Sequence, residues 1–596
     1  MVRRYCLNMS LRKYTPYILL ALLVLAAGKG AFALGQSILL NARGPLDADS
    51  ANYFIIGRTI LNGFSLYRDH FDVQPPGIFL LAALSLVLTG GEKLTTILII
   101  FMLSALPITF AALAWHRARK ADTVFRCTLA LLAFVIGVLL VLYLEERAPT
   151  VETQLFGGFL SVMFALAMLH HPNRFHWFWT PACSLLLLGS IILKEPFLLS
   201  NAAVALLIAR DRTHFLLGFI VPLVIGCIAG VLLLLLLGML VPYVDSLHTT
   251  FIYRSAVSTT RFGPVSYRIL SYYILFQNVT NVYVAAPLLG YLLLFFWSRA
   301  PAYRAVYEGA ERIVMTITLF AAVACGAGIL TTIHRMLLHQ YAAAHHVPLQ
   351  DGLLPVPITL FLLSLPFLAS LPLLYRRCLL RSVLLTLVAL GLTALAVGSS
   401  VYSGNHFAFA VPAYAAVAIL FIHESAVLGR ATPAFLVGVI LTLVTVTVYQ
   451  PNPSHLLYLK NRQGYTREAQ RERTDRLDAL LDACDVRQFH NEALPEFAMA
   501  RHSPFGPLIL PYEYMGQDHP LSVQTAEQIN QHANVVVATR DYARPSYTKD
   551  HDRVVETLRR LLPVSFTTDA PPCAAPFAPI DGVTLWFRKD VFSKIQ

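Results

Sequence analysis

The chain has 596 residues, of which 56% are hydrophobic and 13% charged, and its formal net charge is +12. A soluble domain carries about 25% charged residues, so this composition excludes an ordinary soluble enzyme. The basic excess lies in residues 1–450, which carry 29 Lys and Arg against 16 Asp and Glu, whereas residues 451–596 carry 17 against 18. Because the excess is confined to the hydrophobic part, it indicates basic connections between membrane helices and no nucleic-acid partner.

Apolar runs of about twenty residues, the length that crosses a bilayer core, recur through residues 1–450. The first begins at Thr15 behind a basic flank and shows no obvious cleavage site, so it predicts a retained first helix and not a signal peptide. The fold class is therefore a multi-pass α-helical membrane protein with about 13 transmembrane helices. We expect these helices at 15–37, 94–115, 124–144, 152–170, 177–193, 197–209, 214–241, 281–297, 312–331, 354–374, 380–398, 405–422 and 432–449.

The basic connections between these helices all fall on one side of the membrane. They are the N-terminal flank and the segments at 116–120, 210–212, 299–312, 375–381 and 430. By the positive-inside rule, the N-terminus is in the cytoplasm and the C-terminal domain lies outside the cytoplasmic (inner) membrane. An apolar segment at 76–91 would break this alternation if it crossed. It is also short for a span, so it predicts a juxtamembrane or re-entrant helix.

Acidic residues concentrate on the opposite, outer side. Of the 16 Asp and Glu in residues 1–450, 11 lie there. Orientation in the membrane depends on Lys and Arg and hardly on acids, so topology does not explain this concentration. A binding or catalytic cavity around residues 45–91 does explain it.

The first outer loop, residues 38–91, contains the sequence GPLDADSANYFIIGRTILNGFSLYRDHFDVQPPG at 44–77. Asp47 and Asp49 stand two residues apart directly after the first helix. Two carboxylates this close suit a divalent cation such as Mg or Mn, or a general base whose pKa is set by its neighbour. The structural alternative is a helix N-cap at Asp49 or Ser50, with the helix ending at Gly63.

This segment resembles the lipid-linked-sugar glycosyltransferases of the GT-C superfamily. The shared pattern is D-x-D-(E)-x-x-Y, a helix ending in Gly, then L-Y-R-D and D-x-x-P-P-G. The protein O-mannosyltransferases and the lipid A aminoarabinose transferases are the families most similar in pattern. The resemblance implies a GT-C-like transmembrane catalytic domain over residues 1–450 and a C-terminal extracytoplasmic α/β domain over 451–596.

Carried over by position, the resemblance assigns the catalytic acid to Asp49, four residues before Tyr53. The Glu that follows this acid in the family is Ser50 here, and Asp47 is an additional acid. Relatives often place a Lys before the paired prolines to meet the lipid phosphate, but this chain has Gln74 there. The phosphate must then be met by another cation.

Other residues on the outer side are candidates for the same site. Glu152 opens a helix, where an acid is also favourable simply through the helix dipole. Lys194 lies at a membrane boundary, where a contact to the lipid phosphate competes with a pair to Glu195 or with snorkelling. His406, before Pro412, is either a site residue or a satisfied structural group. The remaining candidates are Arg58, Arg254 and Arg261 for the donor phosphate, and Tyr53, Asp72 and Glu152 for the acceptor or the site lining.

The function implied is transfer of a sugar from a polyprenyl-phosphate-linked donor to a glycan, lipid or protein acceptor, with Asp49 as the general base and membrane lipids around the spans. One alternative is a transporter or flippase, which typically shows internal repeats and charges near the bilayer midplane. Another is a sugar-chain polymerase or ligase of the cell envelope. No glycine-rich phosphate loop follows a strand in residues 1–450, which argues against a soluble nucleotide-sugar donor.

Residues 451–596 contain no spanning run. GYTREAQRERTDRLDALLDAC predicts an amphipathic helix, and NVVVATR and VTLWFRK predict strands. The only two cysteines of this part are Cys484 and Cys573. In an oxidising compartment they favour a disulfide that closes a loop of about ninety residues, the alternative being two unpaired thiols.

Overall fold

The computed structural model describes only part of the chain. The described residues are 2–44, 46, 48–70, 72, 74–144, 151, 153–249, 388–389, 392–393, 396, 408–428, 466–486, 489–491, 499–502, 527, 529–539, 565–577, 579–580 and 583–592. The helices expected at 281–297, 312–331, 354–374 and 432–449 lie outside these residues, as does most of the one expected at 380–398.

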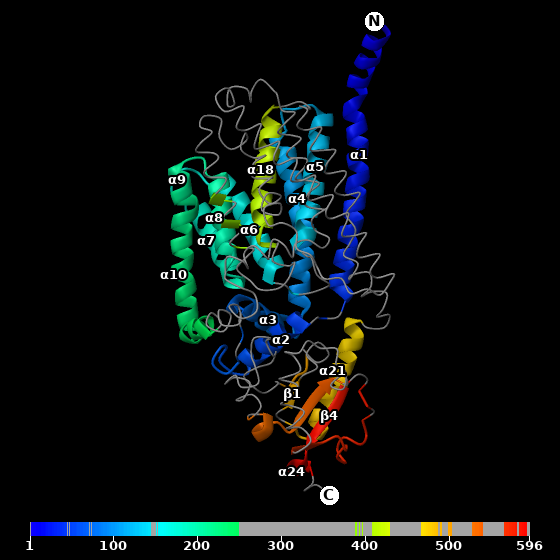
Figure 1. The fold of residues 1–596 in the computed structure, drawn as a ribbon, viewed down its shortest axis with the longest axis vertical. Helices are drawn as coiled ribbons and strands as arrows, with labels where there is room; N and C mark the ends of the chain where they lie inside the picture. The colour runs from blue at the N-terminus through cyan, green and yellow to red at the C-terminus, as the bar shows by residue number, and fades with distance from the viewer. Residues whose placement is uncertain are drawn as a thin grey trace, which may run out of the picture.

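Long apolar helices run side by side along the longest axis of the molecule (Figure 1). Five helices of the described part are long and apolar enough to cross a membrane, so the chain is a multi-pass helical membrane protein. The bundle comprises α1 (Val2–Arg43), α4 (Lys93–Arg117), α5 (Thr123–Leu144), α6 (Thr153–His170), α7 (Trp179–Leu193), α8 (Phe197–Ile208), α9 (Arg212–Phe215), η1 (Leu216–Ile220), α10 (Val221–Leu236) and α18 (Val411–Leu428).

Most of these bounds agree with the hydrophobic pattern to within a few residues, and three differ. Helix α1 includes the basic flank and continues to Arg43, so the loop after it begins at Gly44 and not at residue 38. The helix expected at 214–241 ends at Leu236, because Gly238 adopts a φ of 65° and a separate helix follows at 240–249. Helix α18 starts later than residue 405, at Val411, with Pro412 in its first turn.

The connections sort to the two ends of the bundle. The N-terminus and α9 lie at one end, and the C-terminal elements lie at the other (Figure 1). Chain order then brings the basic connections at 116–120 and 210–212 to the N-terminal end. It brings residues 44–92, 194–196 and 237–249 to the end that faces the C-terminal elements. The sorting of basic connections to one end follows the expected alternation.

Two short helices, α2 (Ala48–Leu61) and α3 (Pro76–Thr89), lie between the bundle and the C-terminal elements (Figure 1). Together they form most of the first loop, which we define as residues 44–92. Helix α3 has 14 residues and spans about 21 Å, too short for a bilayer core of about 30 Å. The two helices pack closely, because a Cβ on Gly57 of α2 would lie 2.8 Å from the backbone nitrogen of Ala83 in α3. The segment expected to be juxtamembrane or re-entrant is therefore a packed layer at the end of the bundle.

The C-terminal elements combine helices with a four-stranded sheet. The elements are α21 (Arg467–Ala483), β1 (Phe489–Asn491), β2 (Val535–Thr539), β3 (Phe566–Thr567), β4 (Val583–Arg588) and α24 (Lys589–Phe592). The strand order is β1-β2-β4-β3, with β1 parallel to β2 and the other pairs antiparallel. Helix α21 buries Leu477 and Leu481 against this sheet, which is the apolar face that the sequence predicts. Cys484, at the end of α21, forms a disulfide with Cys573, with Cα atoms 5.2 Å apart.

Candidate active site in the first loop

Asp49 lies in the first turn of α2 and is half-buried. The next residue, Ser50, is fully buried, and its hydroxyl oxygen accepts a hydrogen bond of 2.7 Å from the backbone N–H of Val151. Ser50 therefore does not cap its own helix, which already begins at Ala48. Instead it ties the start of α2 to the chain directly before α6. Val151, two positions before α6, is thereby brought to the helix that carries Asp49.

The residues that follow on α2 face the rest of the first loop. Tyr53 is 5% exposed, and its ring meets Phe79 of α3 edge to face, with the centroids 5.6 Å apart. Asn52 is buried, and its side-chain amide donates a hydrogen bond of 2.8 Å to Oδ2 of Asp72. The N-terminal half of α2 is therefore fixed by contacts on two sides. These contacts restrict rotation of the helix about its axis, and Asp49 lies in its first turn.

Asp72 organises the loop that connects α2 to α3. It is 1% exposed, and its Oδ1 accepts a hydrogen bond of 2.8 Å from the backbone N–H of Gln74. Its backbone carbonyl accepts another from the hydroxyl of Ser246, in the helix at 240–249, at 2.7 Å. With Asn52 on its second carboxylate oxygen, Asp72 joins three segments of the chain. These contacts favour a positioning role for Asp72 over direct contact with a substrate.

Lys194 meets Gln74, the residue directly before the paired prolines. Lys194 is 8% exposed, and its ammonium donates a hydrogen bond to the side-chain amide oxygen of Gln74. Glu195, its neighbour in sequence, instead accepts a hydrogen bond of 2.7 Å from the Tyr243 hydroxyl. The expected alternative of a Lys194–Glu195 pair is therefore not what these residues form. The positive charge of Lys194, directly after α7, therefore lies next to the side chain of Gln74.

The glycine after the paired prolines accounts for this contact. Helix α3 begins at Pro76, and a Cβ on Gly77 would lie 2.6 Å from the carbonyl oxygen of Ile192 in the last turn of α7. Any side chain at this position would separate the two helices. The P-P-G sequence thus lets α3 approach the backbone of α7 two residues before Lys194, which brings Gln74 within reach of the lysine.

Two tyrosines, the buried Tyr67 and the half-buried Tyr243, pack together beside these groups. Tyr67 and Tyr243 pack with ring centroids 5.1 Å apart, and the Tyr67 hydroxyl donates a hydrogen bond of 2.7 Å to the carbonyl of Gln74. Burial raises the pKa of Tyr67 well above its ordinary value, and the charges of Asp72 and Glu195 add to the shift. Burial, and then the neighbouring Glu195, also raise the pKa of Tyr243. Both hydroxyls therefore stay protonated and act as donors.

The backbone of Tyr67 is unusual. Its φ is 69°, a left-handed conformation that few residues other than glycine adopt, and its N–H donates a hydrogen bond of 2.8 Å to the carbonyl of His70. Such conformations cost on the order of 1–3 kcal/mol and persist where the surrounding structure imposes them. The L-Y-R-D sequence is therefore a constrained turn that directs the Tyr67 ring against Tyr243.

Among the expected site residues that the structure describes, Arg58 lies away from this cluster. Arg58, farther along α2, donates to the carbonyl of Met499 at 3.5 Å and lies near Asp478, so it faces the C-terminal elements. Burial lowers the pKa of Arg58, and the charge of Asp478 opposes this shift. Five expected residues lie outside the described part of the chain, namely Asp47, Glu152, Arg254, Arg261 and His406.

Within the described residues, no group of three or more His, Cys, Asp and Glu side chains is arranged to hold a metal ion. Asp47, which the sequence pairs with Asp49 as a cation ligand, is not among these residues.

Sequence reasoning missed Asn52, Tyr67, Tyr243 and Ser246. Tyr67 stood inside the quoted L-Y-R-D pattern, and Asn52 stood one position before the aligned Tyr53. Tyr243 and Ser246 gave no local signal, because they reach the site from the helix at 240–249, more than 170 positions after the loop they contact.

Comparison with known proteins adds little to this geometry. No family model matches the chain, and no curated protein matches it. Among solved structures, the crystal structure of ArnT from Cupriavidus metallidurans bound to undecaprenyl phosphate is similar at 13% identity and a TM-score of 0.36, covering 94% of this chain and 97% of that one. A TM-score this low does not establish a shared fold. The function therefore has to be inferred from the residues of this chain.

Proposed function

We propose that this chain is a glycosyltransferase that moves a sugar from a polyprenyl-phosphate-linked donor to an acceptor at the extracytoplasmic membrane face. The observation that carries the proposal is the contact between Lys194 and Gln74. The motif resemblance demands a cation where this chain has a glutamine. Lys194, at the junction of α7 and α8, contacts Gln74, which lies in the same loop as Asp49, and this contact supports Lys194 as that cation.

In the proposed reaction, Asp49 removes the proton from an acceptor hydroxyl while that oxygen attacks the anomeric carbon of the donor sugar. The bond between the anomeric carbon and the phosphate oxygen breaks, and a new glycosidic bond forms with inverted configuration. The leaving group is a polyprenyl phosphate, which departs as a stable anion and needs positive charge more than it needs a proton.

Lys194 supplies that charge at the edge of the first loop. Arg254, Arg261 and His406, which come later in the chain, are proposed to add further positive charge around the phosphate. The protonated hydroxyls of Tyr67 and Tyr243 hold Gln74 and Glu195 in place. Asp72 fixes the loop, and Tyr53 and Glu152 are proposed to line the acceptor side. Arg58 faces the C-terminal elements, which makes it the weakest candidate for the phosphate.

A divalent cation on Asp47 and Asp49 is a further proposal, and its function would be to neutralise the leaving phosphate. Dialysis of the purified protein against EDTA, followed by addition of Mg or Mn, tests it. Turnover that is lost after EDTA and recovered with Mg or Mn supports the cation. Unchanged turnover after EDTA indicates that side chains alone neutralise the leaving phosphate.

The orientation belongs to the same proposal. With the N-terminus and the basic connections in the cytoplasm, the first loop and the C-terminal domain lie outside the inner membrane. That placement suits a donor whose lipid anchor stays in the bilayer while its sugar is exposed on the outer side.

A transporter or flippase is the alternative from a different class, and a sugar-chain polymerase or ligase is the alternative with a similar donor. The experiment uses purified protein in nanodiscs with polyprenyl phosphate that carries a radiolabelled hexose, pentose or aminopentose. Release of free polyprenyl phosphate together with a labelled acceptor, in single-sugar steps, supports the proposal. Movement of labelled lipid between leaflets without cleavage indicates a flippase, and long labelled chains indicate a polymerase.

A further inference from the structure

The C-terminal helix α21 contacts the chain immediately before Asp49. Gln470 of α21 is 5% exposed, and its side-chain amide pairs with the backbone of Leu46, 424 positions earlier. Its Oε1 accepts the N–H of Leu46 at 3.1 Å, and its Nε2 donates to the carbonyl of Leu46 at 3.4 Å. A side-chain amide that bonds to both the backbone N–H and the backbone carbonyl of one residue fixes the orientation of that residue. A neighbouring β-strand makes the same pair of hydrogen bonds. Leu46 lies two positions before α2 begins.

The same face of α21 contacts the end of α1. Arg467 donates hydrogen bonds of 3.0 Å to the carbonyl of Asn41, in the last turn of α1, and to the carbonyl of Gly44, directly after α1. Its third contact is the Thr96 hydroxyl of α4, at 2.8 Å. Arg467 and Gln470 are three positions apart, one helical turn, so both side chains leave α21 in the same direction.

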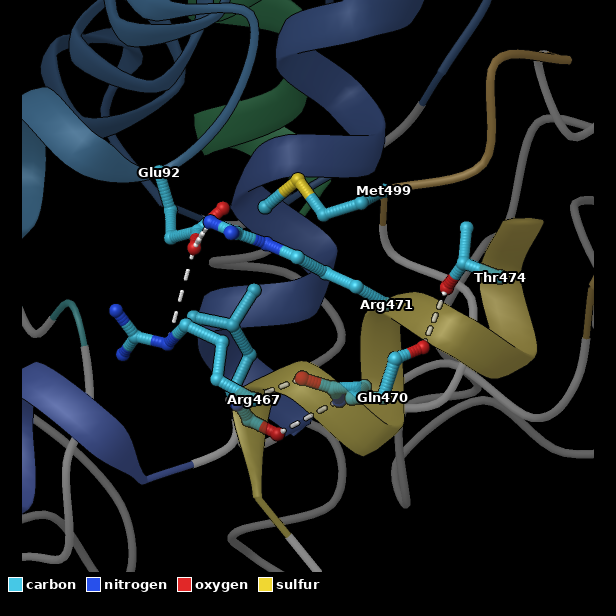
Figure 2. A pocket seen from close by; sticks show the side chains of 7 residues that line it. Glu92, Arg467, Gln470, Arg471, Thr474 and Met499 are labelled. Carbon is cyan, nitrogen blue, oxygen red and sulfur yellow. Dashed lines mark hydrogen bonds and ion pairs between the residues drawn. The ribbon is translucent and has the colours of Figure 1, made fainter.

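A buried carboxylate holds α21 against the bundle. Glu92, directly before α4, is 2% exposed, forms an ion pair with Arg471 and lies 3.8 Å from Nε of Arg467 (Figure 2). Figure 2 shows both arginines directed towards Glu92, and Gln470 beside them on α21. Burial lowers the pKa of Arg467, and the Glu92 charge opposes this shift. Truncating Glu92 would remove the charge that compensates Arg467, whose side chain is 12% exposed, so the contact is specific to this docked arrangement.

Asp49 therefore lies between two tethers that reach it from opposite directions in the sequence. Before it, Leu46 is held by Gln470. After it, Ser50 is held by the backbone of Val151 at 2.7 Å. General-base catalysis needs the carboxylate within hydrogen-bond reach of its proton, and a displacement of about 1 Å costs roughly a hundredfold in rate. Asp49 therefore lies in a segment of five residues, 46 to 50, whose two ends are both held by hydrogen bonds.

We propose that Gln470 is a positioning residue for the transfer reaction, and that the C-terminal domain completes the active site by setting where Asp49 points. This inference rests on the proposed function for its catalytic consequence. Its structural part, that Gln470 orders Leu46 and the first turn of α2, stands independently of the reaction. The C-terminal domain is then a required part of the catalytic unit and not only an appended module.

The test compares three variants of the full-length protein. Gln470→Met keeps the length of the side chain and removes both hydrogen bonds. Gln470→Glu keeps the oxygen that accepts the N–H of Leu46. Glu468→Gln, on the exposed side of the same helical turn, is the matched control. If Gln470→Met is not recovered folded, Gln470→Asn replaces it, because its amide is one methylene too short to reach Leu46.

The first readout is amide hydrogen exchange in the peptide that covers residues 44–54, measured without substrate. We expect Gln470→Met to speed exchange at Leu46 and in the first turn of α2 at least tenfold, with β2 and β4 unchanged. Gln470→Glu should show a smaller change and Glu468→Gln none. Unchanged exchange in Gln470→Met overturns the proposal, whatever the chain catalyses.

The second readout separates positioning from general stability. With polyprenyl-phosphate-sugar as donor, we expect Gln470→Met to lower kcat at least tenfold while KM for the donor stays within about twofold, and Gln470→Glu to recover part of kcat. A kcat within twofold of wild type in Gln470→Met refutes the positioning role, as does an equal loss in Glu468→Gln. If the wild-type protein transfers no sugar from any such donor, the proposed function fails, and the exchange result still decides the structural part.

Discussion

The ammonium of Lys194 donates a hydrogen bond to the side-chain amide of Gln74, a residue 120 positions earlier in the chain. This contact places a charge from the end of α7 at the position before Pro75 and Pro76. In the proposed site, the two side chains together take the place of the lysine that the resemblance leads us to expect at that position. The proposed donor site is therefore built from two segments that the bundle brings into contact.

An exchange of these two side chains tests the assignment directly. Lys194→Gln alone should lower kcat/KM for the polyprenyl-phosphate donor by one to two orders of magnitude, because the leaving phosphate loses a charged hydrogen-bond donor. The double variant Gln74→Lys/Lys194→Gln should regain much of that loss. Steady-state kinetics over a range of donor concentrations measure both values. A double variant no more active than Lys194→Gln would argue that the charge is needed elsewhere.

Asp49 should be essential for turnover and dispensable for folding. We expect Asp49→Asn to reduce transfer at least a hundredfold, since loss of a general base typically costs that much. Asp69→Asn is the control, because Asp69 lies in the same loop and pairs with the exposed Arg68 at 3.1 Å. It should retain most activity. An Asp49→Asn protein that keeps more than about a tenth of wild-type turnover would remove Asp49 from the role of base.

The close approach at Gly77 predicts a position that accepts no side chain. Gly77→Ala places a methyl group 2.6 Å from the carbonyl oxygen of Ile192, so α3 and α7 must separate. We expect a loss of about 1–3 kcal/mol in stability and a rise in KM for the donor as Gln74 moves from Lys194. Gly91→Ala, in the same loop, meets nothing within 4 Å and serves as the control. Equal thermal stability and equal KM in the two variants would contradict the packing argument.

The two ends of the bundle should differ in access from outside the cell. In a protein without its other free cysteines, Asn62→Cys in the first loop should react with an impermeant thiol reagent in intact cells. Lys120→Cys, between α4 and α5, should react only after the membrane is opened. Both positions are exposed, whereas the nearby Ala118 is 1% exposed and would be a poor reporter. The reverse labelling pattern would invert the topology.

The disulfide between Cys484 and Cys573 closes a loop of 89 positions in the C-terminal domain. The chain-entropy model gives such a loop roughly 4–5 kcal/mol of stabilisation. We expect the double variant Cys484→Ser/Cys573→Ser to melt at a lower temperature, and the native protein to resist alkylation at both positions until it is reduced. Free alkylation of both thiols in the non-reduced protein would show that the bridge does not form in cells.

The sequence by itself determined the elements that depend on neighbours in the chain. The helix bounds from α4 to α8 followed from apolar runs and basic ends, because a helix must be long and apolar enough to cross the bilayer. The short apolar run after Pro76 predicted a short helix, and α3 has 14 residues. The motif around Asp49 located the first loop as the candidate site, and the leucine spacing of α21 predicted its buried face.

Only the tertiary structure decided which residues meet in that site. Lys194 with Gln74, Ser50 with Val151, and Gln470 with Leu46 are pairs separated by 120, 101 and 424 positions. Hydrophobic periodicity acts over one or two helical turns and carries no information about which helix ends become neighbours. That choice is made when the helices pack, and here it depends on close approaches such as the one at Gly77, where a missing side chain sets the distance between two backbones.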